Sequence, residues 1–237
     1  MQKVSFQVSP LAKHVSLRER VSVHLRDAIT SGLLRPGEKL KERELCELLA
    51  ISRPSLREAL RSLEAEHLII NIPNKGPEVA RLSLREAKDL YAMRRLLESF
   101  AARAFTELAT DEQVQALEAT TKKLAAAALS EVGADVIGAK TEFYSVLLSG
   151  CGNSLVQETL GGLLTRVSLL RATSLLNPQR LPKSMKEIQA LMVAIKSRDA
   201  AGAERDSKRH LLNAERAALA AFEKQLTISN FYRRSKS

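Results

Sequence analysis

Residues 42–65, ERELCELLAISRPSLREALRSLEA, decide how the N-terminal part of the chain folds. Apolar residues recur there at spacings of three and four in both halves, which is the periodicity of amphipathic helices. They are Leu45, Leu48 and Leu49 in the first half, and Leu56, Ala59, Leu60 and Leu63 in the second. Ser52 is a suitable N-cap for the second half, and Pro54 falls in its first turn, where the missing N–H is tolerated. The stretch therefore predicts two short helices joined by a tight turn.

The second of these helices carries polar and basic side chains at its start. Arg53, Ser55 and Arg57 face away from the leucines. In helix-turn-helix proteins, the side chains at the start of the second helix contact base edges in the major groove. The same pattern also fits an ordinary helical hairpin with a solvated basic face. The next part of the chain favours the DNA-reading interpretation.

Two short β-favouring runs follow, LIINI at 68–72 and EVARL at 78–82, separated by the turn-forming residues PNKG at 73–76. Such runs on either side of a turn predict a β-hairpin. A hairpin directly after a recognition helix is a wing, and Lys75 at its tip can reach the phosphate backbone or the minor groove. Residues 16–82 are therefore predicted to form a winged helix-turn-helix domain.

Composition and charge fit a helical protein with a polyanionic partner. Of the 237 residues, 45% are hydrophobic and only 4% aromatic, and the formal net charge is +10. Low aromatic content favours helices over sheets, and a basic chain suits nucleic acid. The two cysteines, Cys46 and Cys151, form neither a disulfide framework nor a zinc cluster. No apolar run is long enough for a membrane span or a signal peptide, so we expect a cytoplasmic protein without membrane contact.

The C-terminal two-thirds of the chain is helical in pattern almost throughout. Ser83 with Glu86, and Ser184 with Glu187, have the spacing of capping boxes at helix starts. Apolar stripes at helical spacing follow, which predicts an antiparallel bundle of about six helices. The expected fold class is therefore mainly α.

These patterns divide the chain into four parts. Residues 1–15 lack periodicity and are expected to form a flexible arm before the winged helix-turn-helix domain at 16–82. Residues 83–225 are expected to form the helical domain, and residues 226–237 a basic tail that ends in FYRRSKS, residues 231–237, which are expected to be disordered.

The run GLLRPGEKLKERELCELLAISRPSLREALRSLEAEHLIINIPNKGPEV, residues 32–79, resembles the DNA-binding domain of GntR-type bacterial transcription regulators. The family positions that contact operator DNA correspond to Arg43, Ser52, Arg53, Ser55, Arg57 and Gly76. The resemblance implies that the three arginines contact the operator, that the serines contact phosphates or bases, and that the wing glycine enters the minor groove. An arginine on the exposed helix face can pair with guanine through two hydrogen bonds.

Three later stretches resemble the FCD effector-binding domain, which defines the FadR subfamily of GntR regulators. They are DLYAMRRLLE at 89–98, EFYSVLLSGCGNSLV at 142–156 and RDAAGAERDSKRHL at 198–211. The resemblance implies a homodimer that binds double-stranded DNA at a pseudo-palindromic operator. It also implies a small effector, often a carboxylic acid, that changes the affinity for the operator.

Most members of this domain family hold a divalent metal with an Asp, a His four residues later and two further His. The matching positions here are Lys140, Tyr144, Ile188 and His210. Tight metal sites need several converging ligands, and a lone histidine does not supply them. The sequence therefore predicts no metal and no other cofactor, and His210 also suits a hydrogen-bonded core histidine.

Two basic residues, Arg94 and Lys140, lie on the inward-facing stripes of their predicted helices. Buried cations need anionic partners. One interpretation is an internal salt bridge, for example with Glu98 or Glu142. The other is that Lys140 replaces the charge of the metal and, with Arg94, binds the carboxylate or phosphate of an effector. The effector-binding residues in this second interpretation are Arg94, Lys140, Tyr144 and His210.

The sequence thus predicts a DNA-binding transcription regulator whose operator affinity is modulated by a small anionic metabolite bound in the helical domain. The alternative is a constitutive DNA-binding dimer with a degenerate effector pocket. An enzyme is not predicted, because the chain contains no GxSxG, no HExxH, no phosphate-binding loop and no evident nucleophile–base pair.

Overall fold

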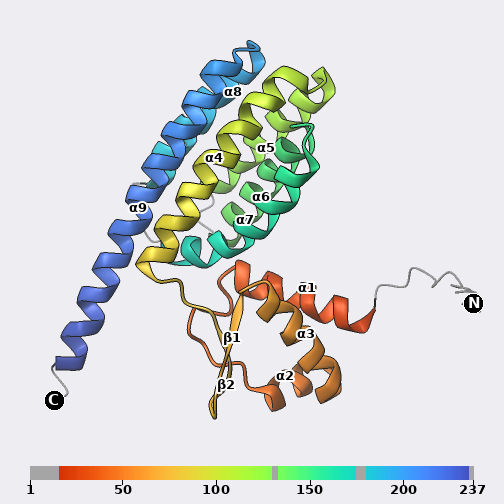
Figure 1. Ribbon diagram of the computed structural model, residues 1–237, viewed down its shortest axis with the longest axis vertical. Helices are drawn as coiled ribbons and strands as arrows, with labels where there is room; N and C mark the ends of the chain where they lie inside the picture. The colour runs from red at the N-terminus through yellow and green to blue at the C-terminus, as the bar shows by residue number, and fades with distance from the viewer. Residues whose placement is uncertain (1–15, 130–132, 175–179, 235–237) are drawn as a thin grey trace, which may run out of the picture.

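The computed structural model describes residues 16–129, 133–174 and 180–234. It is mainly helical, with a small N-terminal head at residues 16–82 below a bundle of long helices (Figure 1). The arm predicted at residues 1–15 lies outside the described residues. Within the described part of the chain, no helix is both long and apolar enough to cross a membrane.

The head contains the predicted helix-turn-helix unit. Its helices are α1 (Leu17–Thr30), α2 (Glu42–Leu49) and α3 (Arg53–Ala65). Ser52 caps α3 as predicted, because its side chain accepts a hydrogen bond from the Ser55 amide. Ala50 takes a left-handed conformation, with φ of 50°, at the turn between α2 and α3. Leu48 departs from the prediction and is 79% exposed, since α2 packs on α3 through Leu45 and its neighbours Cys46 and Leu49.

The predicted wing is an antiparallel hairpin of β1 (Ile69–Ile72) and β2 (Gly76–Val79). Ile72 pairs with Gly76, so three residues, 73–75, make the turn. The Lys75 amide donates a hydrogen bond to the Ile72 carbonyl at 3.0 Å. Gly76 has φ of 83°, a left-handed conformation that favours glycine. These contacts confirm the hairpin and place Lys75 at its tip.

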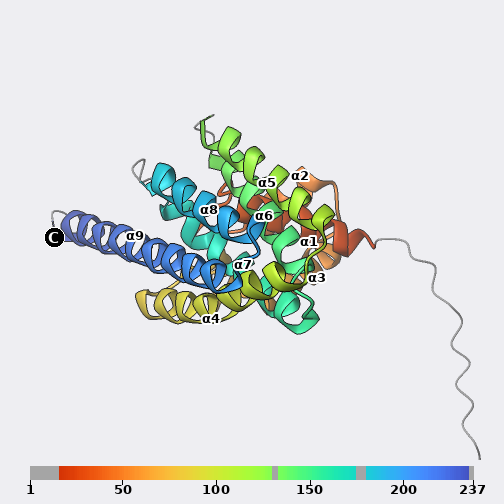
Figure 2. The ribbon, with the colours of Figure 1, turned by 90° about the horizontal axis from the view of Figure 1, so that it is seen from above.

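The rest of the described chain forms the predicted antiparallel bundle. Its helices are α4 (Leu84–Leu108), α5 (Asp111–Leu129), α6 (Gly133–Ser149), α7 (Ser154–Ser174), α8 (Arg180–Lys196) and α9 (Ala200–Arg234). Seen from above, α4 lies beside α9, and α5 packs along α6 (Figure 2). The capping box at the start of α4 is confirmed, with reciprocal hydrogen bonds between Ser83 and Glu86.

The predicted capping box at Ser184 is wrong. Helix α8 already begins at Arg180, because Pro182 falls in its first turn, where a missing N–H is tolerated. Ser184 is therefore inside the helix and only 1% exposed. Glu187 does not cap the helix but binds partners on α9.

The basic tail predicted from residue 226 is helical over most of its length, including residues 231–234, where disorder was predicted. Helix α9 continues to Arg234 and extends beyond the bundle (Figure 1). No Gly or Pro follows Gly202 in the sequence, so nothing in the chain stops the helix earlier. Residues 235–237 lie outside the described part.

The head and the bundle share one hydrophobic cluster. Leu25 and Leu63 of the head pack in the same buried group as Leu90 of α4, Leu169 of α7 and Ala218 of α9. A shared core of this kind couples the position of the head to the packing of the bundle helices. The head is therefore in direct contact with the bundle helices.

Candidate DNA-binding surface and effector site

The start of α3 presents the predicted DNA-contacting side chains to solvent. Arg53 is exposed and has no ion-pair partner among the residues that the structure describes. The Arg57 Nε atom lies 3.1 and 3.2 Å from the two carboxylate oxygens of Glu42 on α2. The hydroxyl oxygens of Ser52 and Ser55 are 3.0 Å apart. The first turn of α3 thus offers two guanidinium groups and two hydroxyl groups on one end of the helix.

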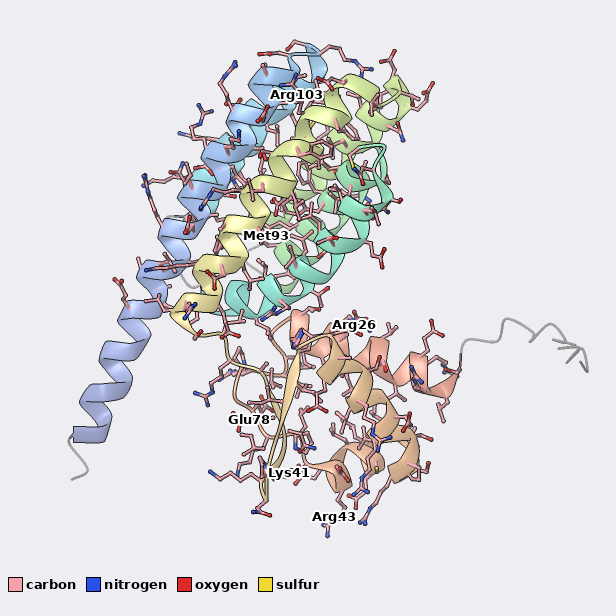
Figure 3. All side chains as sticks on the ribbon, in the orientation of Figure 1. Arg26, Lys41, Arg43, Glu78, Met93 and Arg103 are labelled. Atoms are coloured by element: carbon pink, nitrogen blue, oxygen red, sulfur yellow. The ribbon has the colours of Figure 1, made fainter. Side chains whose placement is uncertain are left out.

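The other predicted contacts lie on α2 and the wing. Arg43 is exposed at the end of the head furthest from the bundle, and its Nε atom is 3.4 Å from a carboxylate oxygen of Glu47 (Figure 3). Lys75 is exposed, and a Cβ added at Gly76 would meet no atom within 4 Å. The space beside Gly76 is therefore open. The structure places all these residues on α2, the start of α3 and the hairpin.

The acidic partners on this surface bind the arginines only weakly. The side chains of Arg57 and Arg43 are 63% and 79% exposed. Solvent-exposed ion pairs contribute only about 0–1 kcal/mol. A phosphate or a base edge can therefore replace Glu42 or Glu47 at little cost.

Inside the bundle, Arg94 is fully enclosed by protein groups and is only 2% exposed. Its Nε atom donates to Glu98 at 2.5 Å, and its Nη2 atom donates to the Tyr144 hydroxyl at 3.3 Å. Burial alone would lower the pKa of Arg94, but the charge of Glu98 and contacts with Tyr144 and Tyr91 raise it above its ordinary value. For Arg94, the internal salt bridge with Glu98 is the arrangement found.

A second buried polar cluster joins α8 to α9 around Glu187. His210 Nδ1 lies 2.7 Å from Glu187 Oε2, and Arg180 Nη2 lies 2.8 Å from the same oxygen. The Asn213 side chain donates to the other carboxylate oxygen at 2.9 Å. Burial opposes the charge of Glu187, but these three hydrogen bonds lower its pKa to about 2. His210 is therefore a hydrogen-bonded histidine, as one of the two interpretations anticipated.

Lys140 is half-buried on α6, next to this cluster. Burial is the main cause that lowers the pKa of His210, Glu187 opposes it, and the charge of Lys140 lowers it further. Glu142, the acidic partner considered for Lys140, binds Lys123 at 2.6 Å. The positive charge of Lys140 thus favours the neutral form of His210.

Two donor groups in the same region have no hydrogen-bond partner within the described residues. They are Arg180 Nη1 and the Ser184 hydroxyl, both buried. Buried polar groups are nearly always hydrogen-bonded, so an unsatisfied pair marks a place for a water or a ligand. Sequence reasoning missed Arg180, although its spacing of four and seven from Ser184 and Glu187 places the three on one face of α8.

The residues at the family's metal positions do not fit a divalent cation. Ile188 is apolar and 3% exposed, and Lys140 brings a positive charge. In the described part of the chain, no group of three or more His, Cys, Asp or Glu side chains is placed to hold a metal ion. The chemistry of this donor set suits an anion better than a metal.

Comparisons with known proteins agree with this architecture. The family model described as bacterial regulatory proteins, gntR family, matches residues 17–79, and the FCD domain model matches residues 89–213. The HTH-type transcriptional repressor GlaR of Escherichia coli K12 is 30% identical over 197 residues, which is 79% of this chain and 89% of GlaR.

Two solved structures share the fold. E. coli McbR/YncC has a TM-score of 0.75 at 21% identity and covers 94% of this chain and 100% of its own. A putative GntR transcriptional regulator from Rhodococcus sp. RHA1 has a TM-score of 0.79 at 23% identity, over 86% of this chain and 98% of its own.

A winged helix-turn-helix head on a helical FCD bundle defines a class of bacterial transcription regulator. The chain belongs to the GntR family, and its FCD domain is consistent with the FadR-like subfamily.

Proposed function

We propose that the protein is a sequence-specific regulator that binds double-stranded DNA through its winged head. The observation that carries this proposal is the pair of exposed guanidinium groups, Arg53 and Arg57, at the start of the second helix of a helix-turn-helix unit. Such a helix places its first residues against base edges in the major groove. The DNA-contacting residues we propose are Arg43, Ser52, Arg53, Ser55, Arg57, Lys75 and Gly76.

The matched pair Arg53→Ala and Arg61→Ala tests this assignment. Both arginines are exposed on α3, but Arg61 lies two turns further along and pairs with Glu58. Loss of a bidentate base contact costs about 1–3 kcal/mol, so Arg53→Ala is expected to weaken operator binding roughly 5- to 150-fold. Arg61→Ala should change it little. Fluorescence anisotropy on a selected duplex measures both, and equal affinities of the two variants would contradict the assignment.

We also propose that the regulator acts as a homodimer on a pseudo-palindromic operator. Met93, Leu96 and Phe100 recur at helical spacing on α4 as an apolar stripe and are 43%, 66% and 45% exposed; Figure 3 labels Met93. A contiguous exposed apolar patch is typical of an interaction surface, and a symmetric pairing of α4 helices would cover the stripe in both copies. Such a dimer presents two heads to the two half-sites of an operator.

In the bundle, we propose that a small anionic metabolite binds near Lys140 without a metal. Lys140 and the unsatisfied donors of Arg180 and Ser184 supply the positive charge and hydrogen bonds that a carboxylate requires. Tyr144 and His210 border the same region, while Arg94, neutralised by Glu98, contributes by holding the Tyr144 hydroxyl in place. The effector acts by binding one arrangement of the two heads more tightly than the other.

Thermal shifts with a panel of carboxylates test the effector site. A carboxylate that stabilises the wild type should stabilise Lys140→Ala much less, because the charge opposite the carboxylate is gone. Lys186→Ala, an exposed lysine on α8, is the matched control and should respond like the wild type. Equal thermal shifts in the wild type and Lys140→Ala would show that Lys140 does not bind the carboxylate.

The internal neutralisation of Arg94 by Glu98 favours one alternative, a constitutive DNA-binding dimer with a degenerate pocket. In that case no carboxylate would produce a thermal shift, while operator binding would remain intact. The same panel therefore separates the two functions.

A further inference from the structure

A cavity of about 350 Å³ lies where the head meets the bundle. Its walls come from three helices, α1 of the head and α6 and α7 of the bundle, and Figure 3 shows Arg26 at this junction. The cavity lies within the usual size range of small-molecule sites, about 300–1,000 Å³. We call it the junction cavity. Its lining residues are Arg26, Asp27, Thr30, Thr141, Tyr144, Ser145, Leu148, Gln157, Gly161, Leu164 and Thr165.

The lining follows helical spacing on each wall. On α7, for example, the lining residues Gln157, Gly161 and Leu164 are separated by four and three positions, which places them on one face. Tyr144 lines the cavity and also accepts the hydrogen bond from buried Arg94. Tyr144 therefore connects the junction cavity to the polar interior of the bundle.

The charges at the cavity do not suit an anion. Arg26 is already bound to Glu66, with its Nε and Nη2 atoms 2.7 and 2.6 Å from the two carboxylate oxygens. The formal charge left in the lining is the exposed carboxylate of Asp27. The charge of Asp27 would therefore repel a carboxylate or phosphate ligand, and Arg26 is already paired with Glu66.

The hydrogen-bonding groups of the lining are rich in acceptors. The hydroxyls of Thr30, Thr141 and Thr165 donate to backbone carbonyls at 3.3, 2.9 and 2.9 Å, so each oxygen keeps lone pairs with which it can accept hydrogen bonds. Asp27 adds carboxylate acceptors, and the Gln157 side chain supplies both a donor and an acceptor. A ligand with several hydroxyl groups can donate hydrogen bonds to these acceptors.

We infer that the junction cavity binds an uncharged polyhydroxy molecule of monosaccharide to disaccharide size. The ligand touches α1 on one side and α6 and α7 on the other, so it stabilises the head position seen in this structure. It thereby changes the affinity for DNA by population shift, a consequence that rests on the proposed function. The cavity shares Tyr144 with the proposed anion site near Lys140, but its other lining residues are different.

Two glycines on α7 provide a matched test. A Cβ added at Gly161 or at Gly162 meets no atom within 4 Å, so both positions accept a side chain in the folded protein. Only Gly161 lines the cavity. Gly161→Leu fills the cavity from α7, whereas Gly162→Leu adds the same side chain to the same helix outside it. Circular dichroism checks that both variants fold.

Isothermal titration calorimetry on the full chain measures binding of D-glucose, D-galactose, D-xylose and myo-inositol, with D-gluconate and putrescine as charged probes. At least one uncharged probe is expected to bind the wild type and Gly162→Leu, and to bind Gly161→Leu at least about tenfold more weakly because of the introduced clash. No binding of any uncharged probe, binding of the charged probes only, or undiminished binding by Gly161→Leu would overturn the inference.

The readout separates this inference from the proposed function. Calorimetry is done without DNA, so its result does not depend on whether the head reads an operator. A probe that binds in the cavity but leaves the affinity for DNA unchanged would support the cavity as a binding site. It would contradict the inference that the ligand stabilises one position of the head. A wild type that binds a probe but no DNA would contradict the proposed function alone.

Discussion

At the scale of single residues, two polar clusters in the bundle, Arg94 with Glu98 and Glu187 with His210, pair each charged side chain with a hydrogen-bonding partner. Arg94 and Glu98 are one helical turn apart, so the sequence already offered this pair as an alternative to effector binding. Glu187 and His210 lie on different helices, 23 positions apart, and no local pattern connects them. A hydrogen-bonded core histidine was therefore one of the two interpretations of His210 from the sequence, but the sequence did not show which carboxylate binds it.

The depressed pKa of Glu187 makes a pH-dependent contribution to stability. Its folded-state pKa is about 2, against an ordinary value of 4.5, so its stabilising effect is complete above about pH 4.5 and is lost as the pH falls toward 2. Glu187→Gln is expected to cost roughly 2 kcal/mol at pH 7, after allowance for solvent screening. The difference from the wild type should shrink at pH 3.5.

Urea denaturation at the two pH values measures this difference. Glu158→Gln, on an exposed part of α7, is the control and should be close to neutral at both. A cost for Glu187→Gln that is the same at pH 7 and pH 3.5 would show that the ionised carboxylate does not provide the stabilisation.

At the scale of elements, some helix boundaries are determined by capping side chains next to them in the sequence, and others by tertiary packing. The starts of α3 and α4 were predictable because Ser52 and Ser83 cap the first turns with their own side chains. The start of α8 was not, because Ser184 has the spacing of a cap but is buried inside the helix. The extent of α9 was not predicted, because its C-terminal residues were assigned to a basic tail although the helix continues to Arg234.

The exposed stripe on α4 leads to a prediction about assembly. Leu96→Glu places a charge in the middle of the stripe, and a buried unpaired charge is costly, so the variant is expected to be monomeric where the wild type is dimeric. Leu129→Glu makes the same change at a leucine that is 86% exposed at the end of α5, and should leave the dimer intact. Sedimentation velocity distinguishes the two. A dimeric Leu96→Glu protein would place the interface elsewhere.

At the scale of the whole molecule, the contacts between head and bundle are the part of the structure that could not be predicted from the sequence. The winged head and the helical bundle were each predicted from local periodicity and from turn residues such as those at 73–76. The shared cluster of Leu25, Leu90 and Leu169 and the junction cavity depend on how the two parts meet. Contacts between residues far apart in sequence leave no periodic trace, which is why only the structure shows them.

Selection of DNA from a random duplex library by the full-length wild type tests the central claim most directly. If the protein is a dimeric winged-helix regulator, selection should enrich a pseudo-palindrome whose half-sites lie about one helical turn apart. Binding to that duplex should weaken steeply with salt, since arginines and lysines displace counterions from phosphates. Folded, dimeric protein that enriches no sequence, or binds every duplex equally, would contradict the account.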